Sequence, residues 1–206
     1  MLPSEERCPR CTVQIAYCMC PHLESPIETH AHVVIVRHAR EKLRPTNTAA
    51  IAAMTLARAT LADYGEIGAP VIDIDGLIPE GAWLLYPDAR EGASLVVRGA
   101  PPPSALMVLD GTWSQTQRLV RRHPRLGMLP RCALPPGPRE WRPHLRHSDD
   151  PDRLLTMEAI AIYLALHEPG DAGARLMKMH RRFVAATLAS RGQFVPPRWV
   201  ETGATT

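Results

Sequence analysis

Short apolar runs alternate with helix-like segments along most of the 206-residue chain. The first run, residues 32–37, is brief and rich in β-branched side chains, which is typical of a strand buried in a parallel sheet. Residues 83–86 and 105–109 form two similar runs, and Pro87 ends the first of these. The pattern therefore predicts at least these strands in a buried sheet.

Helical segments are expected between and after the strands. Thr46, Asn47 and Thr48 offer N-cap side chains for an Ala-rich helix that extends to about residues 64–65. Residues 130–147 are rich in Pro and Arg, which predicts irregular structure with one or two edge strands. Because strands and helices alternate, the predicted fold class is α/β, with a mostly parallel sheet flanked by helices. The other expected helices cover about residues 114–123, 156–167 and 172–191.

The first 25 residues differ from the rest because they are rich in cysteine and show no apolar periodicity. Zn²⁺ prefers four thiolates in structural sites, and short loops between ligands limit the entropy lost on binding. We expect a structural zinc knot over residues 1–25, with His22 as a substitute ligand, and a catalytic domain over 26–206. Four reduced thiols without a metal are the alternative. The candidate ligands are Cys8, Cys11, Cys18 and Cys20.

Composition fits an ordinary globular protein, with 45% hydrophobic and 22% charged residues. No apolar run reaches the roughly 20 residues that a membrane helix needs. The first residues also lack the basic-then-apolar order of a secretory signal. We therefore expect a cytoplasmic location, no membrane association and no protein partner.

Arginine supplies nearly all of the basic charge, because Lys42 and Lys178 are the only lysines among 24 basic residues. Compositional bias explains this as well as a functional role does, although guanidinium groups pair well with phosphate. On the expected 114–123 helix, three arginines face away from the apolar side and have no acidic residue four positions away. A solvated face is the ordinary interpretation, and contact with a polyanion is the functional one. These arginines are Arg118, Arg121 and Arg122.

Polar and aromatic residues follow the predicted strands directly, where ligands bind in open α/β sheets. Asp110 comes after the 105–109 run, Gly111 permits close backbone approach, and Trp113 can stack on a planar group. Equally, Asp110 could cap the next helix and Trp113 could be a core residue. Further along, Thr156 and Glu158 open a helix whose N–H groups could bind a ligand, or they serve only as its cap and dipole partner. The other strand-end residues are Arg37, His38, Glu41, Asn47, Thr48, Tyr86 and Pro87.

Together these segments resemble the DTW-domain family, named for its aspartate–threonine–tryptophan signature, over nearly the whole chain. Two positions depart from the family's pattern: Thr116 replaces an expected alanine, and Trp141 stands where tyrosine is usual. The matching segments are the cysteine knot, Arg37-His38-x2-Glu41, Thr46-Asn47-Thr48-Ala49, Leu84-Leu85-Tyr86-Pro87, Pro103-Ser104, Leu109-Asp110-Gly111-Thr112-Trp113-Ser114-Gln115, Leu129-Pro130 and Leu155-Thr156-Met157-Glu158-Ala159.

The resemblance implies a SPOUT-like fold with a C-terminal knot and the activity of a tRNA-uridine aminocarboxypropyltransferase. Such an enzyme transfers the 3-amino-3-carboxypropyl group of S-adenosylmethionine to N3 of a tRNA uridine and releases methylthioadenosine. Asp110 would accept the N3 proton or hold the ammonium group of S-adenosylmethionine. The expected catalytic residues are Asp110, Thr112 and Trp113; the cofactor-binding residues are Leu85, Tyr86, Pro87, Leu109, Asp110, Thr156 and Glu158; and the RNA-contacting residues are Arg37, His38, Asn47, Arg118, Arg121 and Arg122.

Two other functions fit the same sequence features. An S-adenosylmethionine-dependent RNA methyltransferase would release S-adenosylhomocysteine instead of methylthioadenosine. A non-catalytic RNA-binding module with zinc and arginine would bind no S-adenosylmethionine. Fold analogy alone does not choose among these chemistries.

Overall fold

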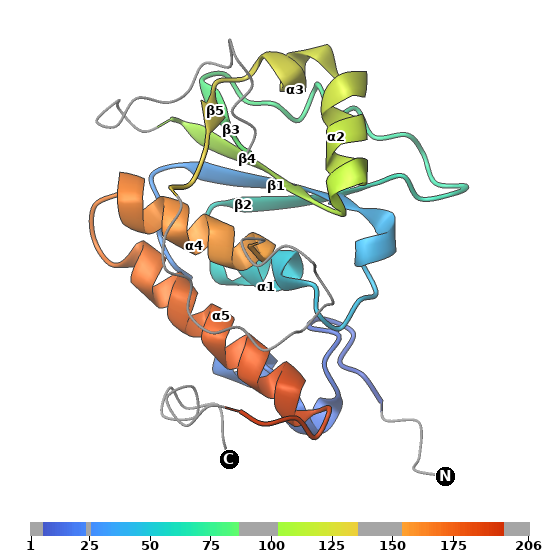
Figure 1. Ribbon diagram of the computed structural model, residues 1–206, viewed down its shortest axis with the longest axis vertical. Helices are drawn as coiled ribbons and strands as arrows, with labels where there is room; N and C mark the ends of the chain where they lie inside the picture. The colour runs from blue at the N-terminus through green and yellow to red at the C-terminus, as the bar shows by residue number, and fades with distance from the viewer. Residues whose placement is uncertain (1–5, 24–25, 87–102, 136–153, 196–206) are drawn as a thin grey trace.

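A computed structural model describes residues 6–23, 26–86, 103–135 and 154–195. Its centre is a five-stranded, all-parallel sheet with the strand order β2-β1-β4-β3-β5 (Figure 1). The strands are β1 (His32–His38), β2 (Ala59–Tyr64), β3 (Ala82–Leu85), β4 (Ala105–Asp110) and β5 (Arg131–Cys132). The helices are α1 (Thr48–Thr55), α2 (Trp113–Arg122), α3 (Pro124–Met128), α4 (Thr156–His167) and α5 (Ala172–Ala189). The predicted α/β class with a parallel sheet is confirmed.

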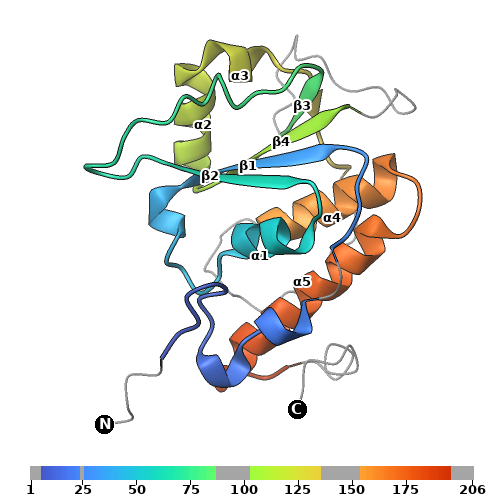
Figure 2. The same ribbon diagram turned by 180° about the vertical axis from the view of Figure 1, so that it is seen from behind.

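Helices cover both faces of the sheet. Figures 1 and 2 show α1, α4 and α5 on one face, and α2 with α3 on the other. Strand β1 contributes to both cores, because Val33 and Ile35 pack in the cluster with α1, α4 and α5, while Val34 and Val36 pack in the cluster with α2 and α3. Burial on both faces explains why this strand is a continuous apolar run rather than an alternating one.

The predicted extension of the first helix to residues 64–65 is wrong. Helix α1 ends at Thr55, and residues 59–64 form the edge strand β2. The N–H of Ile27 donates to the Thr55 carbonyl at 2.8 Å, and the N–H of Ala57 donates to the Ile27 carbonyl at 2.9 Å. These bonds turn the chain, and pairing with β1 then satisfies its backbone groups, so tertiary contacts override the helix propensity of alanine.

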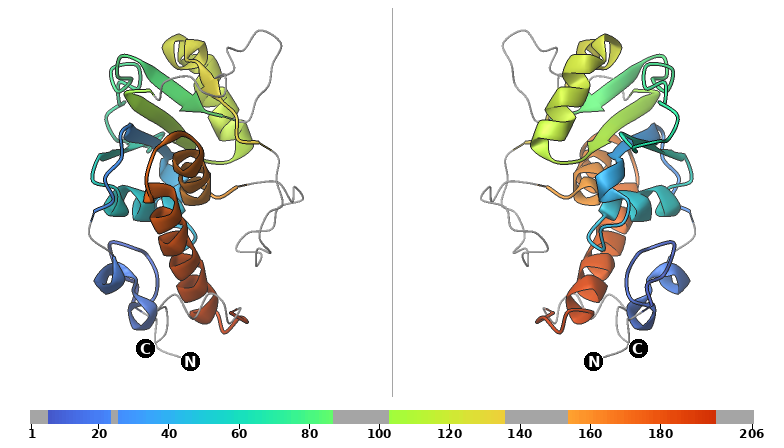
Figure 3. Two further views of the ribbon diagram at one scale, coloured as in Figure 1. Left: turned by 90° about the vertical axis from the view of Figure 1, so that its left-hand side faces the viewer. Right: turned by 90° about the vertical axis from the view of Figure 1, so that its right-hand side faces the viewer.

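The N-terminal segment packs against the main body near the end of α5 that lies away from the sheet (Figure 3). It contains two 3₁₀ turns, Ile15–Tyr17 and Cys20–His22. Cys11 and Met19 belong to the same hydrophobic cluster as Ile51 of α1 and Leu176 of α5. The cysteine-rich segment and the sheet domain therefore share one core.

Two further predictions concern a C-terminal knot and membrane-spanning helices. The C-terminal knot implied by the family resemblance is not shown by the described residues and stays a prediction. None of the helices in the described parts of the chain is long and apolar enough to cross a membrane.

Candidate functional site

Strands β1 and β4 lie side by side, and the chain leaves them in opposite directions. From β1 it passes through α1 to β2, whereas from β4 it passes through α2 and α3 to β5 on the other side of the sheet. The carboxyl ends of two such neighbouring strands flank the position where open α/β sheets bind ligands. His38 and Asp110 end these two strands.

Three charged residues form a row across the carboxyl ends of β2, β1 and β4. Arg37 is in register with Asp63 on one side and with Asp110 on the other. Residues in register on adjacent strands point to the same face of a sheet. Their hydrogen bonds to the starts of α1 and α4 show that this is the face covered by those helices.

Arg37 forms a two-point ion pair with Asp63. Its Nε lies 2.6 Å from Oδ1 of Asp63 and its Nη2 lies 3.0 Å from Oδ2. The Arg37 side chain is only 7% exposed, and its Nη1 donates to Oδ1 of Asn47 at 3.2 Å. We predicted that Arg37 contacts RNA, but the structure turns its guanidinium inward, where it supports Asn47.

Asp110 accepts hydrogen bonds on both carboxylate oxygens from two other elements. The side-chain amide of Asn47 donates to Oδ2 at 2.7 Å, and the hydroxyl of Thr156 donates to Oδ1 at 2.5 Å. The orientation of the Asn47 amide is fixed, because its oxygen accepts from Arg37 and from the N–H of Ala50 at 3.1 Å. Asp110 is 7% exposed, so it is a firmly held carboxylate at the rim of the sheet.

The start of α4 differs from the prediction in one detail. Thr156 is the first helical residue and not the N-cap, which is Leu155. Glu158 accepts a hydrogen bond from the N–H of Leu155 at 3.4 Å, so its carboxylate stabilises the helix start. The N–H of Met157 donates to the hydroxyl of Thr48 at 3.2 Å and joins the starts of α4 and α1. The hydroxyl of Thr156 is therefore directed to Asp110 instead of to its own helix.

Thr112 and Trp113 begin α2, on the opposite face of the sheet from the charged row. Thr112 caps α2 together with Gln115, whose side-chain oxygen accepts from the N–H of Thr112 at 2.7 Å. Trp113 is 45% exposed and stacks on Tyr86, with ring centroids 5.3 Å apart and an interplanar angle of 15°. The guanidinium carbon of Arg131 lies 5.3 Å from the same tyrosine ring. Trp113 thus presents a supported, partly exposed indole and is not a core residue.

His38 lies near this second face, with its ring edge-on to Tyr64 at a centroid distance of 5.0 Å. Its Nδ1 accepts a hydrogen bond from the N–H of Arg40 at 3.1 Å. Burial, together with the positive charge of Arg40, lowers the pKa of His38 below its usual value. At neutral pH His38 is therefore an uncharged ring.

The remaining predicted residues lie either at the carboxyl ends of strands or on helix α2. Leu85 and Leu109 lie at the carboxyl ends of β3 and β4, and Pro87 lies outside the described residues. Thr116 and Leu119 form the buried side of α2, while its arginines are exposed to solvent. The exposed arginines of α2 are Arg118, Arg121 and Arg122.

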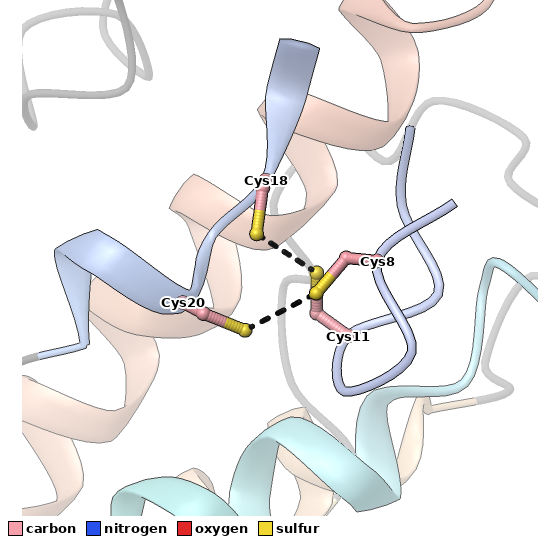
Figure 4. Close-up of side chains that lie close together, drawn as sticks. All are labelled: Cys8, Cys11, Cys18 and Cys20. Carbon is pink, nitrogen blue, oxygen red and sulfur yellow. Dashed lines mark hydrogen bonds between the residues drawn. The ribbon is translucent and has the colours of Figure 1, made fainter. Parts of the chain in front are cut away.

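The four N-terminal cysteines converge on one point (Figure 4), with all sulfur atoms within 4.8 Å of one another. The Sγ atoms of Cys8 and Cys20 are 3.7 Å apart, as are those of Cys11 and Cys18. In a tetrahedral site with Zn–S bonds of about 2.3 Å, neighbouring sulfurs are about 3.8 Å apart. The cluster therefore has the dimensions of a four-thiolate metal site.

Backbone hydrogen bonds hold Cys8 in place. The N–H of Cys8 donates to the Val13 carbonyl, and the N–H of Thr12 donates to the Cys8 carbonyl, both at 2.8 Å. Burial and the neighbouring thiols raise the pKa of Cys18 and of Cys20 above the usual thiol value. Cys18 and Cys20 would therefore lose their protons at neutral pH only with a cation beside them.

Comparison with known proteins places this chain in a family. The model of the DTW domain matches residues 5–188, from just before the cysteine cluster to the end of α5. The chain belongs to the DTW domain family. No solved structure matches this DTW domain protein.

Its relatives include proteins named tRNA-uridine aminocarboxypropyltransferase 2. The one from Mus musculus is 28% identical over 124 residues, which cover 56% of this chain and 41% of that protein. The one from Drosophila melanogaster is 26% identical over 134 residues, which cover 62% of this chain and 53% of that protein. This DTW domain chain thus spans about half the length of these relatives.

Proposed function

We propose that this protein is a tRNA-uridine aminocarboxypropyltransferase. The observation that carries the proposal is the DTW domain match over residues 5–188, together with relatives that are named for this activity. The geometry supports it, since a fixed carboxylate and a supported indole lie at the ligand-binding edge of the sheet. An anionic group suits a positively charged donor, and a flat aromatic ring suits a nucleobase.

The proposed reaction forms a bond between uridine N3 and the γ-carbon of the donor and breaks the bond from that carbon to sulfur. The N3 proton is released, and methylthioadenosine leaves. S-adenosylmethionine supplies an activated carbon, so the protein has mainly to orient the reactants.

Asp110 is better suited to holding a cation than to accepting the N3 proton. Asn47 and Thr156 both donate to its carboxylate, and hydrogen bonds to the charged form of an acid stabilise that form. We therefore assign Asp110 to the ammonium group of S-adenosylmethionine. Trp113 is assigned to stacking on a base, because its ring is half exposed and is supported by Tyr86.

The four cysteines are proposed to bind a structural Zn²⁺ ion. All four positions of a tetrahedral ion are filled by thiolates, so no position is left for water or substrate. Zinc in this site would stabilise the fold and take no part in the transfer.

The by-product identifies the reaction. Purified protein incubated with unmodified tRNA and S-adenosylmethionine is expected to release methylthioadenosine, in an amount equal to the aminocarboxypropyluridine formed. Liquid chromatography with mass spectrometry measures both products. Release of S-adenosylhomocysteine would instead identify a methyltransferase, and a protein that neither binds nor consumes S-adenosylmethionine would be a binding module.

The exposed arginines of α2 are expected to contact tRNA phosphates. Replacing Arg118, Arg121 and Arg122 by glutamine should weaken tRNA binding and lower the slope of log K against log salt by about 2 to 3, at roughly 0.7 to 0.9 per lost phosphate contact. Fluorescence anisotropy at several salt concentrations measures this slope. The matched control replaces the same residues by lysine, which keeps the charge and should keep the slope. An unchanged slope in the glutamine variant would remove α2 from the RNA-binding surface.

A further inference from the structure

We propose that the cysteine-rich segment and the loop after β1 together form a second tRNA-binding surface, which continues the contact made by α2. We call this surface the basic edge. It is defined by Arg10 and Arg40, and Thr12 joins its two parts. The inference rests on the proposed function only in taking tRNA as the nucleic acid that is bound.

The cysteine-rich segment and the loop after β1 meet at Thr12. The hydroxyl of Thr12 donates to the Arg44 carbonyl at 3.3 Å. Arg10 lies two residues before Thr12, and Arg40 lies four residues before Arg44, in the 3₁₀ turn at residues 39–41. The two arginines of the basic edge therefore lie on either side of one contact.

Thr12 has a backbone conformation that a β-branched residue rarely adopts. Its φ is 60°, and in the described parts of the chain no other residue except glycine has a positive φ. Such a conformation persists only where the surrounding contacts impose it. The N–H of Thr12 donates to the Cys8 carbonyl at 2.8 Å, and its carbonyl accepts from Nη1 of Arg7 at 3.1 Å. Glycine would adopt this backbone without strain, but it would lose the hydroxyl that reaches Arg44.

Arg10 and Arg40 carry exposed positive charge on the basic edge. Both side chains are exposed to solvent, and neither forms an ion pair with a carboxylate within the described ranges. Their basic neighbours differ, because Lys42 lies 3.6 Å and Arg44 lies 3.4 Å from a carboxylate oxygen. An exposed guanidinium without an acidic partner is suited to bind the oxygens of a phosphate.

The basic edge and the start of α2 lie on the same side of the molecule. The right-hand view of Figure 3 shows the start of α2, the turn at residues 39–41 and the cysteine-rich segment on this side. The turn directly follows His38, the last residue of β1, so it lies at the carboxyl edge of the sheet. Charges spread over three separate elements fit an extended polyanion better than a small anion. A tRNA bound along α2 can thus continue across the turn to Arg10.

The decisive variant is Arg10→Gln/Arg40→Gln. Fluorescence anisotropy with unmodified tRNA and the full chain should show that the slope of log K against log salt falls by about 1.4 to 1.8, at roughly 0.7 to 0.9 per lost phosphate contact. Arg10→Lys/Arg40→Lys keeps the charge and should keep the slope. Arg58→Gln/Arg125→Gln is the matched control, because it removes the same charge from two exposed arginines just before β2 and in α3, near the amino ends of the strands.

Thr12→Gly tests the connection between the two parts of the basic edge. Its Tm should stay close to that of the wild type, because the backbone conformation of Thr12 suits glycine. Its affinity for tRNA should fall by about a few-fold, since Arg10 loses its fixed position relative to Arg40. Thr12→Ser keeps the hydroxyl and should bind tRNA like the wild type. Equal binding by the glycine and serine variants would contradict the role of Thr12.

An unchanged slope in Arg10→Gln/Arg40→Gln would overturn the proposal. An equal fall in slope in Arg58→Gln/Arg125→Gln would also overturn it, because net charge alone would then explain the effect. Loss of binding to vesicles of phosphatidylcholine and phosphatidylserine, with an unchanged tRNA slope, would assign the basic edge to a membrane instead. The proposed function is tested separately: a wild type that binds tRNA with the expected slopes but forms no aminocarboxypropyluridine would keep this surface and reject the transfer activity.

Discussion

Replacing Asp110 with alanine is expected to lower kcat/KM for aminocarboxypropyl transfer by about 100- to 1000-fold, the usual cost of removing one fixed electrostatic contact. The substitution deletes the only group that accepts bonds from both Asn47 and Thr156 in the described site. Nucleoside mass spectrometry of tRNA measures the effect in cells that lack the gene and carry either form. The wild type should restore aminocarboxypropyluridine, and the alanine variant should not.

Two further variants make the Asp110 experiment specific. Asp110→Asn keeps the volume and should be equally inactive, because its amide turns a donor toward Asn47 or Thr156 and carries no charge. Asp75→Asn is the matched control, since Asp75 lies 3.7 Å from His123, away from the charged row, and should leave transfer unchanged. Full activity in either Asp110 variant would reject the assigned role.

Loss of the metal is expected to cause the largest change in stability. Cys11 is 1% exposed and belongs to the main hydrophobic cluster, so Cys11→Ser removes a ligand and loosens a shared core. A ligand present at 1,000 times its Kd stabilises the folded state by about 4 kcal/mol. At about 2–4 °C per kcal/mol for a chain of this size, Tm should fall by roughly 8–16 °C.

Metal analysis and thermal denaturation test this prediction together. Wild-type protein should contain one zinc ion per chain by inductively coupled plasma mass spectrometry, and Cys11→Ser should contain none. A strong chelator should lower the Tm of the wild type toward that of the variant. Cys132→Ser is the control, because Cys132 is a buried cysteine far along the chain, beside His167 at 3.6 Å, and should keep the metal. Equal Tm with and without zinc would contradict a structural role.

The sequence pattern predicted the sheet well where strands are buried on both faces. Residues 32–37 and 105–109 are continuous apolar runs, and both lie in the centre of the sheet. The cysteine cluster was equally accessible, because its ligands are close in sequence and their spacing alone limits the geometry. A short sequence pattern is thus enough to predict a strand that is buried on both faces, and a metal site whose ligands are close in sequence.

The sequence analysis did not predict strand β2, and it therefore did not single out Asp63. Residues 49–62 contain many alanines and neither Gly nor Pro, so nothing in the local pattern marks the end of α1. The pairing of Arg37 with Asp63 was missed for the same reason, because it is fixed by the register of β1 with β2. The sequence did indicate that Arg37 is buried, because this residue directly continues an apolar run.

The residues that pack around the Trp113 ring are also distant from it in the sequence. Tyr86 directly follows β3, and Arg131 begins β5, so the three side chains meet only after the sheet is assembled. The sequence left open whether Trp113 is a core residue or a stacking surface. Its 45% exposure shows that Trp113 is a surface residue. The sequence periodicity of α2 could not have predicted this exposure.

The hydrogen bond from Thr156 to Asp110 has a consequence for synthesis on the ribosome. Thr156 follows Asp110 by 46 residues, after every strand of the described sheet has been made. A nascent chain can therefore pair its strands before α4 has emerged, while the Asp110 carboxylate still lacks the hydrogen bond from Thr156. Affinity for S-adenosylmethionine should appear late in translation, as a sign that the last helices have docked.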